Sequence, residues 1–475
     1  MAKSKTTKKK PPKRKPKPRS AVAEFNYDGA NTDTKRKQPL LRLKSTDQIL
    51  TPTARKRLTS NTRDLMQNFS LAAWAVRRHL DYVSSFSFQP RTGDDELDTT
   101  LVALMKWYSR APHSDVAARH SLPRLVRMAE ERRVVDGDVF IIKMSSGHLQ
   151  VIEGDRVRNP SQTDSSQHDG YVHGVKATKG GRMSSIAVHT RTSGGGYEFE
   201  RIVRSANVFH IGYYDRFDQV RGVSPLAPAI NAFRDVMEAS EYALAKMKVA
   251  QLFGLVFYRE NPDDFGETAS GDESGYDVNF GSGPVKLDLD PGDKAEFLES
   301  KSPPAEFQQF MQTAISVALK SLDLPFSFYD ESFTNFFGSR AALLHYEKAC
   351  KSKRAGLQEL LDRITLWRLG LFISDGDLEL PGGMQLRDVD WEWVHDGTPW
   401  WDPSKEVNGD ILAINAGLKT RSQVIKERHG RDFRTVIDQL AREEEYIQAS
   451  GVSSLAPEPV DIPDSEEEQE DASAD

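Results

Sequence analysis

The sequence predicts an α+β protein made of several substructures. Its 475 residues exceed what one ordinary hydrophobic core holds, so two to four substructures are expected. Short strand-like segments separated by Gly, Asn and Ser dominate residues 139–210, whereas long apolar stripes with helical period dominate much of the rest of the chain. Strands and helices segregated in this way are typical of α+β folds with antiparallel sheets.

Charge is distributed very unevenly along the chain. The sum is −6, from 64 Lys and Arg against 70 Asp and Glu. Residues 1–19 carry ten basic and no acidic residues, residues 456–475 carry nine acidic and no basic residues, and −7 remains on residues 20–455. Such tracts bury too little apolar surface to offset ordering entropy, so both ends are predicted to be disordered. The basic end suggests contact with nucleic acid or an acidic partner, or a solubilising tail.

Several protein classes do not fit this sequence. The one cysteine, Cys350, cannot form an internal disulfide or a thiolate metal site, since each needs at least two. The apolar run of residues 252–257, interrupted by Gly254, is far shorter than the roughly twenty residues of a membrane-spanning helix. The basic start leads into Pro and Lys, not into the apolar stretch of a signal peptide. We therefore expect a soluble protein of a reducing compartment without membrane contact.

The first half of the chain should begin with helices and continue as an antiparallel sheet. Apolar spacing and turn residues predict its elements. In order, these are a helix over residues 60–80, a strand over 81–88, helices over 99–108 and 121–134, a turn at Asp136, Gly137 and Asp138, a hairpin of residues 139–143 and 148–152, and further short strands up to residue 210.

Three long helices are predicted in the second half. The first begins at Ser224, a serine N-cap followed by Pro225, and about 29 residues make it roughly 43 Å long. A second helix opens after Pro303 and Pro304 and has near-ideal apolar spacing. The third runs from Ser339 to about residue 373, with Gly356 as a weak point or bend.

The segments between and after these helices are less regular. A small β-rich insert, with strands over residues 252–258, 285–289 and 296–298, separates the first two helices. Residues 326–338 contain five Phe and one Tyr without a helical or strand period, which is too apolar for a solvated loop. Two or three short helices are predicted over residues 404–449.

Few residue patterns point to catalysis. No phosphate-binding loop, zinc-protease motif, nucleophile elbow or dinucleotide fingerprint was found, so neither a cofactor nor a bound metal is expected. The best candidate is the set Asp290, Asp293, Glu299 and Lys301, because an acid followed by Glu-x-Lys on a strand can hold a divalent metal beside a charge-stabilising lysine in nucleases. The alternative, a solvated strand end, is preferred because a chain with 28 % charged residues contains this short pattern by chance.

Three further features have a structural and a functional interpretation. Cys350 lies on an apolar helix face, which favours a buried structural thiol over a nucleophile. The acidic segment 263–277 lacks calcium-loop spacing, so a solvated surface loop is preferred. Two pairs of tryptophans could stack on nucleic acid, but a place in the core or in a subunit interface is preferred. They are Trp391 and Trp393, and Trp400 and Trp401.

Five groups of short motifs, none of them catalytic, follow one another over residues 55–450. They are Val135–Phe140 with Gln150–Val157; His210 with Arg221–Pro228; Leu289–Asp293; Phe336–Leu343, in which Phe337–Gly338 stand where Tyr-Ser is usual; and Asp402–Glu406 with Ala416–Arg421. In this order they resemble the lambda-type family of tailed-phage portal proteins.

The resemblance implies a portal-protein fold for each part of the chain. A mixed α/β wing is followed by stem helices, a small β-rich clip, a tunnel loop and a helical crown. The implied domains are a basic arm (1–40), the wing (41–223), a stem helix (224–252), the clip (253–302), a second stem helix (303–325), the tunnel loop (326–338), a long helix that returns to the wing (339–401), the crown (402–450) and an acidic tail (451–475).

The function that the resemblance implies is structural rather than enzymatic. Portal proteins form a ring of twelve subunits at one capsid vertex, through which double-stranded DNA is packaged and later ejected. Implied partners are further copies of the chain, the large terminase subunit, the major capsid or scaffold protein and a head-completion protein. The implied location is the virion, after assembly in the host cytoplasm.

Two sets of contact residues are predicted on this basis. Those of the tunnel loop are Phe328, Tyr329, Asp330, Glu331, Phe333, Asn335, Phe336 and Phe337. Those of the arm, toward DNA or a partner, are Lys8, Lys9, Lys10, Lys13, Arg14 and Lys15. Two other classes remain open: a metal-dependent nuclease that uses Glu299, and a non-viral DNA-binding scaffold whose affinity depends on residues 1–19.

Overall fold

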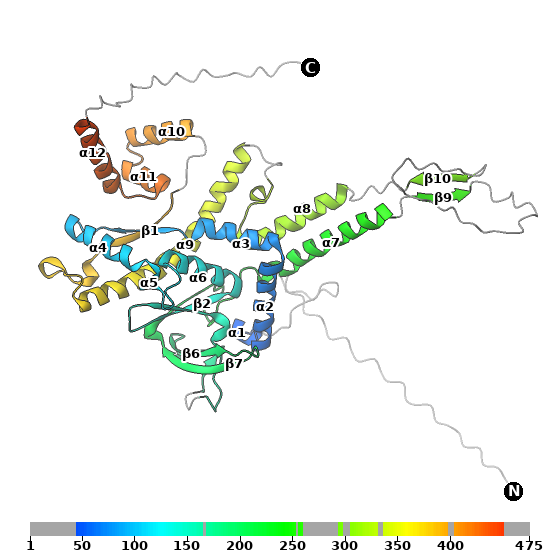
Figure 1. Cartoon of the computed structure of the whole chain (residues 1–475), viewed down its shortest axis with the longest axis horizontal. Coiled ribbons are helices and arrows are strands. Elements are labelled where there is room, and N and C mark those ends of the chain that lie inside the picture. The colour runs from blue at the N-terminus through cyan, green and yellow to red at the C-terminus, as the bar shows by residue number, and fades with distance from the viewer. Residues whose placement is uncertain are drawn as a thin grey trace, which may run out of the picture. The chain divides into compact units, whose positions relative to one another are not determined.

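The computed structural model describes residues 44–164, 168–252, 255–259, 293–297, 305–330, 336–397 and 403–450 (Figure 1). The chain divides into two units, residues 1–45 and 46–475, and all elements below belong to the second. Their composition is mixed α and β, as the sequence predicts, and every pair of named strands is antiparallel. No helix among the described residues is both long and apolar enough to span a bilayer.

The N-terminal helices differ from the single helix predicted over residues 60–80. After the one-turn α1 (Thr46–Ile49), α2 (Pro52–Asn68) and α3 (Ser70–Val83) meet at Phe69, whose backbone is extended. Thr51 caps α2 by accepting a hydrogen bond from the amide of Ala54 at 3.2 Å. The ring of Phe69 meets that of Phe233 edge-on at 6.1 Å, so a tertiary contact accompanies the break that the helical period did not reveal.

The strand predicted over residues 81–88 is wrong in its bounds, because α3 occupies the chain as far as Val83. The strand is β1 (Phe86–Pro90), which pairs antiparallel with β11 (Trp391–His395) from the far end of the chain. Between β1 and the sheets lie three helices. They are α4 (Asp95–Tyr108), α5 (Ala111–Ser114) and α6 (Leu122–Asp136).

Two small sheets follow α6. The predicted turn and hairpin are confirmed: α6 ends at Gly137, and β2 (Asp138–Lys143) pairs with β3 (Leu149–Glu153). β8 (Val208–Gly212) pairs with the other edge of β2, giving the order β3-β2-β8. The second sheet has the order β4-β5-β6-β7. Its strands are β4 (Tyr171–Val172), β5 (Val175–Ala177), β6 (Met183–Arg191) and β7 (Tyr197–Arg204).

The first long helix begins later than predicted. A short 3₁₀ turn at Ala227–Ala229 precedes α7 (Ile230–Leu252). The Ser224 hydroxyl donates to the carbonyl of Val134 at 2.6 Å and accepts from the amide of Leu226 at 3.1 Å. Ser224 therefore fastens the chain to the end of α6 and caps a turn, and the α-helix starts six residues further on.

The second long helix lies beside the first. α8 (Ala305–Leu319) begins directly after Pro303–Pro304, as predicted, and packs along α7 (Figure 1). Between them in sequence, β9 (Leu255–Arg259) and β10 (Asp293–Phe297) pair antiparallel. The strands predicted over 252–258 and 296–298 are therefore shifted by up to three residues, and the one over 285–289 lies outside the described residues.

The third long helix is longer than predicted. α9 spans Phe336–Asp375, so the aromatic segment 326–338 is not all loop. Its first residues form a 3₁₀ turn, Phe326–Phe328, and its last three are helical. Helix geometry tolerates the single glycine among these three at about 1 kcal/mol, so α9 begins three residues before Ser339. α9 also continues through Gly356, where a Cβ would lie 2.9 Å from a guanidinium nitrogen of Arg133, so this glycine provides room for Arg133 and does not end the helix.

Residues after α9 return to the first half and then form three helices. In β11, Trp393 is buried against Phe88, and its indole donates to the Thr365 hydroxyl at 3.0 Å, which supports the core interpretation for this tryptophan. Trp400 and Trp401 lie outside the described residues. The helices are α10 (Pro403–Asn415), α11 (Arg421–His429) and α12 (Phe433–Ala449).

The main core joins the N-terminal helices to the three long helices. Its buried side chains come from α3, α4, α6, α7, α8 and α9 together with one face of β2 and β8. A smaller cluster, which includes Phe140 and Ile152, fills the space between the two sheets. Cys350 is completely buried in the main core, and burial raises the pKa of its thiol to about 11, which agrees with the structural interpretation.

Candidate functional site

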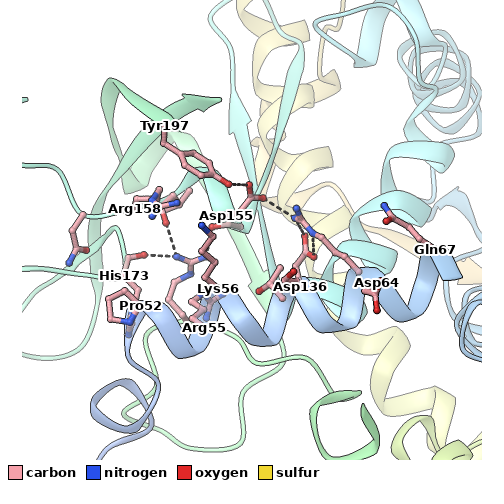
Figure 2. A pocket seen from close by; sticks show the side chains of 17 residues that line it. Pro52, Arg55, Lys56, Asp64, Gln67, Asp136, Asp155, Arg158, His173 and Tyr197 are labelled. Atoms are coloured by element: carbon pink, nitrogen blue, oxygen red, sulfur yellow. Dashed lines mark hydrogen bonds and ion pairs between the residues drawn. The ribbon is translucent and has the colours of Figure 1, made fainter. Parts of the chain in front are cut away.

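Motifs that are far apart in the sequence meet in one place. Asp138 begins β2, Gly154 and Asp155 follow β3, His210 lies in β8, and Arg221 lies in the segment that leads to α7. All of these residues belong to the stretches that carry the family resemblance. The fold brings them to the side of α2, where they form a network of ion pairs beneath a pocket (Figure 2).

Asp138 is the centre of this ion network. Its carboxylate accepts hydrogen bonds from Arg221 at 2.6 and 2.9 Å, from Arg55 at 3.0 Å and from the amide of Gly222 at 3.0 Å, and Nε2 of His210 lies 3.2 Å away. Its side chain is fully buried. Burial alone would raise the pKa of Asp138, but the charges of Arg221 and Arg55 hold it well below its usual range.

Arg221 connects the two sheets to the segment before α7. Besides Asp138, its guanidinium donates to the carbonyls of Gly154 at 2.8 Å, Val157 at 3.1 Å and His173. It also lies over the Phe140 ring, 4.9 Å from the centroid. A planar guanidinium with five donors suits such a junction, because it satisfies several buried carbonyls and a carboxylate at once.

A second group of charges adjoins the first. Arg63 of α2 donates to Asp136 at 2.8 and 2.6 Å, to Asp155 at 2.8 Å and to Glu153 at 3.0 Å. Arg191 of β6 donates to Glu153 and Asp155 from the other side. The three carboxylates have oxygens within 4.8 Å of one another, as metal ligands would. Two guanidiniums pair with these three carboxylates, so one negative charge is in excess here, and the cluster cross-links α2 to both sheets.

Two motif glycines allow the backbone to close around this network. Gly137 has φ of +97°, and a Cβ there would meet the carbonyl oxygen of Gly222 at 2.7 Å and the amide of Ser224 at 2.8 Å. A Cβ on Gly222 would in turn meet the Gly137 carbonyl at 2.1 Å. Only glycine fits at either position, because a Cβ on one residue would overlap the backbone that contains the other.

A third buried cluster joins α3, α6 and α9. Glu130 accepts a hydrogen bond from His79 at 2.9 Å and one from the Tyr213 hydroxyl at 3.0 Å, and it pairs with Arg133 at 2.7 Å. Arg133 also reaches the carbonyl of Lys353 on α9 at 3.3 Å. Burial opposes ionisation of Glu130, but Arg133 and His79 outweigh it and lower its pKa to about 2. Burial likewise lowers the pKa of His79, so the imidazole is neutral and donates.

The pocket above the ion network has a volume of about 550 Å³. One wall is the face of α2 that carries Pro52, Arg55, Lys56 and Asp64, and the other comes from the two sheets (Figure 2). Tyr197 on that second wall donates its hydroxyl to Asp155 at 2.6 Å. Apart from Pro52, Gly154 and Val157 the lining of the pocket is polar or charged, and it contains no pairing of a nucleophile with a base among the described residues.

The predicted tunnel-loop residues are only partly described. Phe328 stacks on Tyr82 with centroids 5.7 Å apart and meets Tyr346 edge-on at 5.3 Å, so it belongs to the core. Tyr329 is 46 % exposed and meets Trp74 edge-on at 6.2 Å. Asp330 follows them, half-buried. Glu331, Phe333 and Asn335 lie outside the described residues, and Phe336 and Phe337 are helical residues of α9 and not loop residues.

The other predicted site residues are placed less completely. The arm residues Lys8, Lys9, Lys10, Lys13, Arg14 and Lys15 lie outside the described residues. Of the nuclease set, Asp293 begins β10, whereas Asp290, Glu299 and Lys301 also lie outside them. The residues that the sequence analysis did not assign to a site are Arg55, Arg63, Asp138 and Arg221. Arg55 and Arg63 stand in none of the quoted motifs, whereas Asp138 and Arg221 do, each next to a glycine.

Comparison with known proteins identifies the family. The model of the family described as "Phage portal protein, lambda family" matches residues 37–354, which is more than half of the chain and includes the whole ion network. The chain belongs to the lambda family of phage portal proteins. Portal proteins of this family are structural components of the virion at a capsid vertex.

Three of the solved structures that are similar to this chain are chains of gene transfer agent (GTA) particles. The chain is 15 % identical to a chain of the "Neck of empty GTA particle computed with C6 symmetry", with a TM-score of 0.47 and coverage of 77 % of this chain and 92 % of that one. It is 14 % identical to a chain of the "Neck of native GTA particle computed with C12 symmetry", with a TM-score of 0.45 and coverage of 77 % of this chain and 92 % of that one. It is 15 % identical to a chain of the "Virion of native gene transfer agent (GTA) particle", with a TM-score of 0.45 and coverage of 79 % of this chain and 98 % of that one. No curated protein matches the chain.

Proposed function

We propose that twelve copies of this portal protein form a ring at one capsid vertex, and that double-stranded DNA passes through its centre during packaging and ejection. The observation that carries the proposal is the family match over residues 37–354. The order of elements agrees with it: a wing over 41–223, α7 and α8 as the two stem helices, and the β9–β10 pair between them as part of the clip.

The charge of the chain suits a channel that must not hold DNA. Each phosphate that a protein neutralises adds a salt-dependent attraction, so a cationic channel would retain the duplex. Residues 20–455 have a net charge of −7, and a ring repeats that charge in every subunit. In this proposal the part of the tunnel loop that follows Phe328 faces the DNA path, with Asp330 and Glu331 as acidic lining, and residues 1–19 supply the attraction to DNA or to a partner.

Partners are assigned to the remaining parts of the chain. The clip, residues 253–302, is the proposed docking site for the large terminase subunit and later for head-completion proteins. Residues 402–450, which include α10, α11 and α12, form the proposed crown on the capsid side, where major capsid or scaffold protein is adjacent. Assembly takes place in the host cytoplasm.

Electron microscopy of the purified full-length protein tests the proposal. Twelve chains of 53.3 kDa should give closed rings with a central channel, and native mass spectrometry should count the subunits. Monomers or dimers whose DNA affinity depends on residues 1–19 would instead indicate a DNA-binding scaffold. Cleavage of plasmid DNA with Mg²⁺ that is lost in Glu299→Ala would indicate a nuclease, and the structural role of the family predicts no such cleavage.

A further inference from the structure

At the Arg55 end of the pocket beside α2, positive charge exceeds the negative charge that it pairs with. Arg55 and Arg221 both donate to Asp138, so two guanidiniums share one carboxylate. Burial lowers the pKa of the adjacent His210, which keeps its imidazole neutral. One positive charge of this buried group is therefore uncompensated, and the Arg55 side chain that lines the pocket is only 13 % exposed.

The adjoining cluster balances this excess in number but not in place, because its three carboxylates pair with Arg63, about two turns further along α2, and with Arg191. Of the next carboxylates, Asp136 is bound by Arg63, and Asp47 accepts the backbone amide of Val220 at 3.0 Å. Burial and the charge of Arg221 lower the pKa of Arg55 to about 10, as expected for a buried cation with too little negative charge nearby. A buried cation of this kind is stabilised by an anion in the adjoining pocket.

Two more cations flank the same end of the pocket. Lys56, the next residue on α2, is exposed and lines it. The guanidinium of Arg158 lies over the Tyr197 ring, 4.2 Å from the centroid, and also lines it. In the part of the chain that the structure describes, neither side chain is bonded to a carboxylate. Both are therefore available to a ligand, whereas Arg63 and Arg221 are fully engaged.

The shape of the pocket favours a peptide over DNA or a small ion. Its α2 wall runs from Pro52 to Gln67, about 22 Å along the helix axis. An extended chain of six or seven residues covers that length, and Thr59 and Ser60 in the wall offer hydroxyls to its backbone. A volume of about 550 Å³ holds a few peptide side chains but not a duplex, whose major groove alone is about 12 Å wide.

We infer that this pocket is a docking site for an acidic peptide segment of a partner protein, with an Asp or Glu carboxylate bound between Arg55, Lys56 and Arg158. Arg55 supplies a fixed charge, held in place by Asp138. Lys56 and Arg158 close around the carboxylate from α2 and from the sheet side, and Tyr197 holds Arg158 in position by stacking. The inference does not depend on the number of subunits in the ring.

Peptide binding to the full-length protein tests this inference. The probe is a fluorescein-labelled hexaglutamate peptide, with hexaglutamine as the uncharged control, measured by anisotropy at 50 mM NaCl. All samples carry Gln at Lys8, Lys9, Lys10, Lys13, Arg14 and Lys15, so that the basic arm does not compete for the probe. We expect hexaglutamate to bind at least tenfold more tightly than hexaglutamine.

Two variants locate the binding. Lys56→Gln with Arg158→Gln should weaken hexaglutamate binding at least tenfold while leaving the melting temperature nearly unchanged, because neither side chain holds a structural ion pair. Arg57→Gln with Arg77→Gln removes the same two positive charges from exposed residues of α2 and α3 that do not line the pocket, and should change binding less than twofold. An equal loss in both would mean that the probe responds only to overall surface charge, and the inference would be wrong.

Two further ligands distinguish an acidic-peptide site from a site for another anion. Binding of inorganic phosphate that depends on Lys56 and Arg158, without binding of hexaglutamate, would assign the pocket to a free oxyanion and overturn the peptide site. An oligothymidylate that binds through the same two residues more tightly than hexaglutamate would assign it to nucleic acid, with the same consequence. The inference is supported if unlabelled acidic peptide displaces hexaglutamate and neither phosphate nor oligothymidylate does so.

Discussion

The guanidinium of Arg221 donates two hydrogen bonds to the carboxylate of Asp138, at 2.6 and 2.9 Å, and both side chains are buried. This pair joins the segment before α7 to the start of β2, 83 residues earlier in the chain. In a ring of the proposed kind it would transmit force between stem and wing. A buried pair of this type is far more sensitive to the loss of one partner than a surface pair.

Asp138→Asn should therefore destabilise the chain by about 3–5 kcal/mol, because it leaves two buried guanidiniums without a counterion. Urea unfolding at pH 7.5, followed by tryptophan fluorescence, measures the change. Asp218→Asn is the matched control: its carboxylate is 54 % exposed and lies 3.7 Å from Arg216, so less than about 0.5 kcal/mol should be lost. Equal losses in the two variants would contradict a stabilising role for the network.

Stability should fall as the solution is acidified. Burial lowers the pKa of His79 and His210, so both stay neutral in the fold while the unfolded chain gains protons below a pH of about 6.5. Despite their burial, Glu130 and Asp138 have lowered pKa values because of Arg133 and Arg221, so below a pH of about 4.5 the unfolded chain again binds more protons. Both effects stabilise the fold at high pH and are lost toward low pH.

Urea midpoints measured between pH 8 and pH 4 check this prediction. We expect a decline that begins below pH 7 and steepens below pH 5. His79→Gln together with His210→Gln should reduce the decline between pH 7 and pH 5, since the side chains no longer titrate, and should leave the steeper acidic part in place. A midpoint that rises on acidification would show that the histidines are charged in the fold.

Gly137→Ala should destabilise the chain more than an alanine at another glycine with positive φ. The methyl group would lie within 2.8 Å of the backbone of residues 222–224, in addition to the strain of φ at +97°. Gly181 is the matched control, since its φ is +83° but a Cβ there meets nothing within 4 Å. We expect a loss of about 1–2 kcal/mol for Gly181→Ala, from the backbone alone, and at least about 3 kcal/mol for Gly137→Ala.

The aromatic segment after α8 should tolerate change at one position and not at its neighbour. Phe328 packs between Tyr82 and Tyr346, so Phe328→Ala should cost about 3 kcal/mol. Tyr329 is 46 % exposed, so Tyr329→Ala should cost less than about 1 kcal/mol. Thermal unfolding of the two variants measures the difference, and similar losses would mean that the segment is equally anchored at both residues.

Charge reversal in the proposed tunnel loop tests the low-friction argument. Asp330→Lys with Glu331→Lys replaces two negative charges by two positive ones in each subunit, and should slow DNA packaging most at low salt, where phosphate contacts are strongest. Asp330→Asn with Glu331→Gln serves as the control, which removes charge without adding attraction. A packaging rate at low salt that equals the native rate would refute the proposed role of these residues.

Local sequence was enough to predict the elements whose signals are local. The hairpin around Gly147, the turn at Gly137 and the start of α8 after Pro304 follow from turn residues, proline and apolar period, which act within a few residues. Cys350 and Trp393 were also correctly expected in the core, because an apolar neighbourhood along one helix face or strand is visible in sequence. The order of short motifs was sufficient to predict the family.

Tertiary structure alone decided where the elements end and which charges meet. Phe69 interrupts a good helical period beside a ring 164 positions away, and Ser224 is held by the end of α6, so neither boundary has a local cause. Arg55, Asp138 and Arg221 come from three distant segments, and nothing in any one segment reveals that two cations share a single carboxylate. Ion pairs depend on distance and burial in space, which sequence spacing does not encode across folded segments. The wall of the pocket beside α2 was therefore found only in the folded chain.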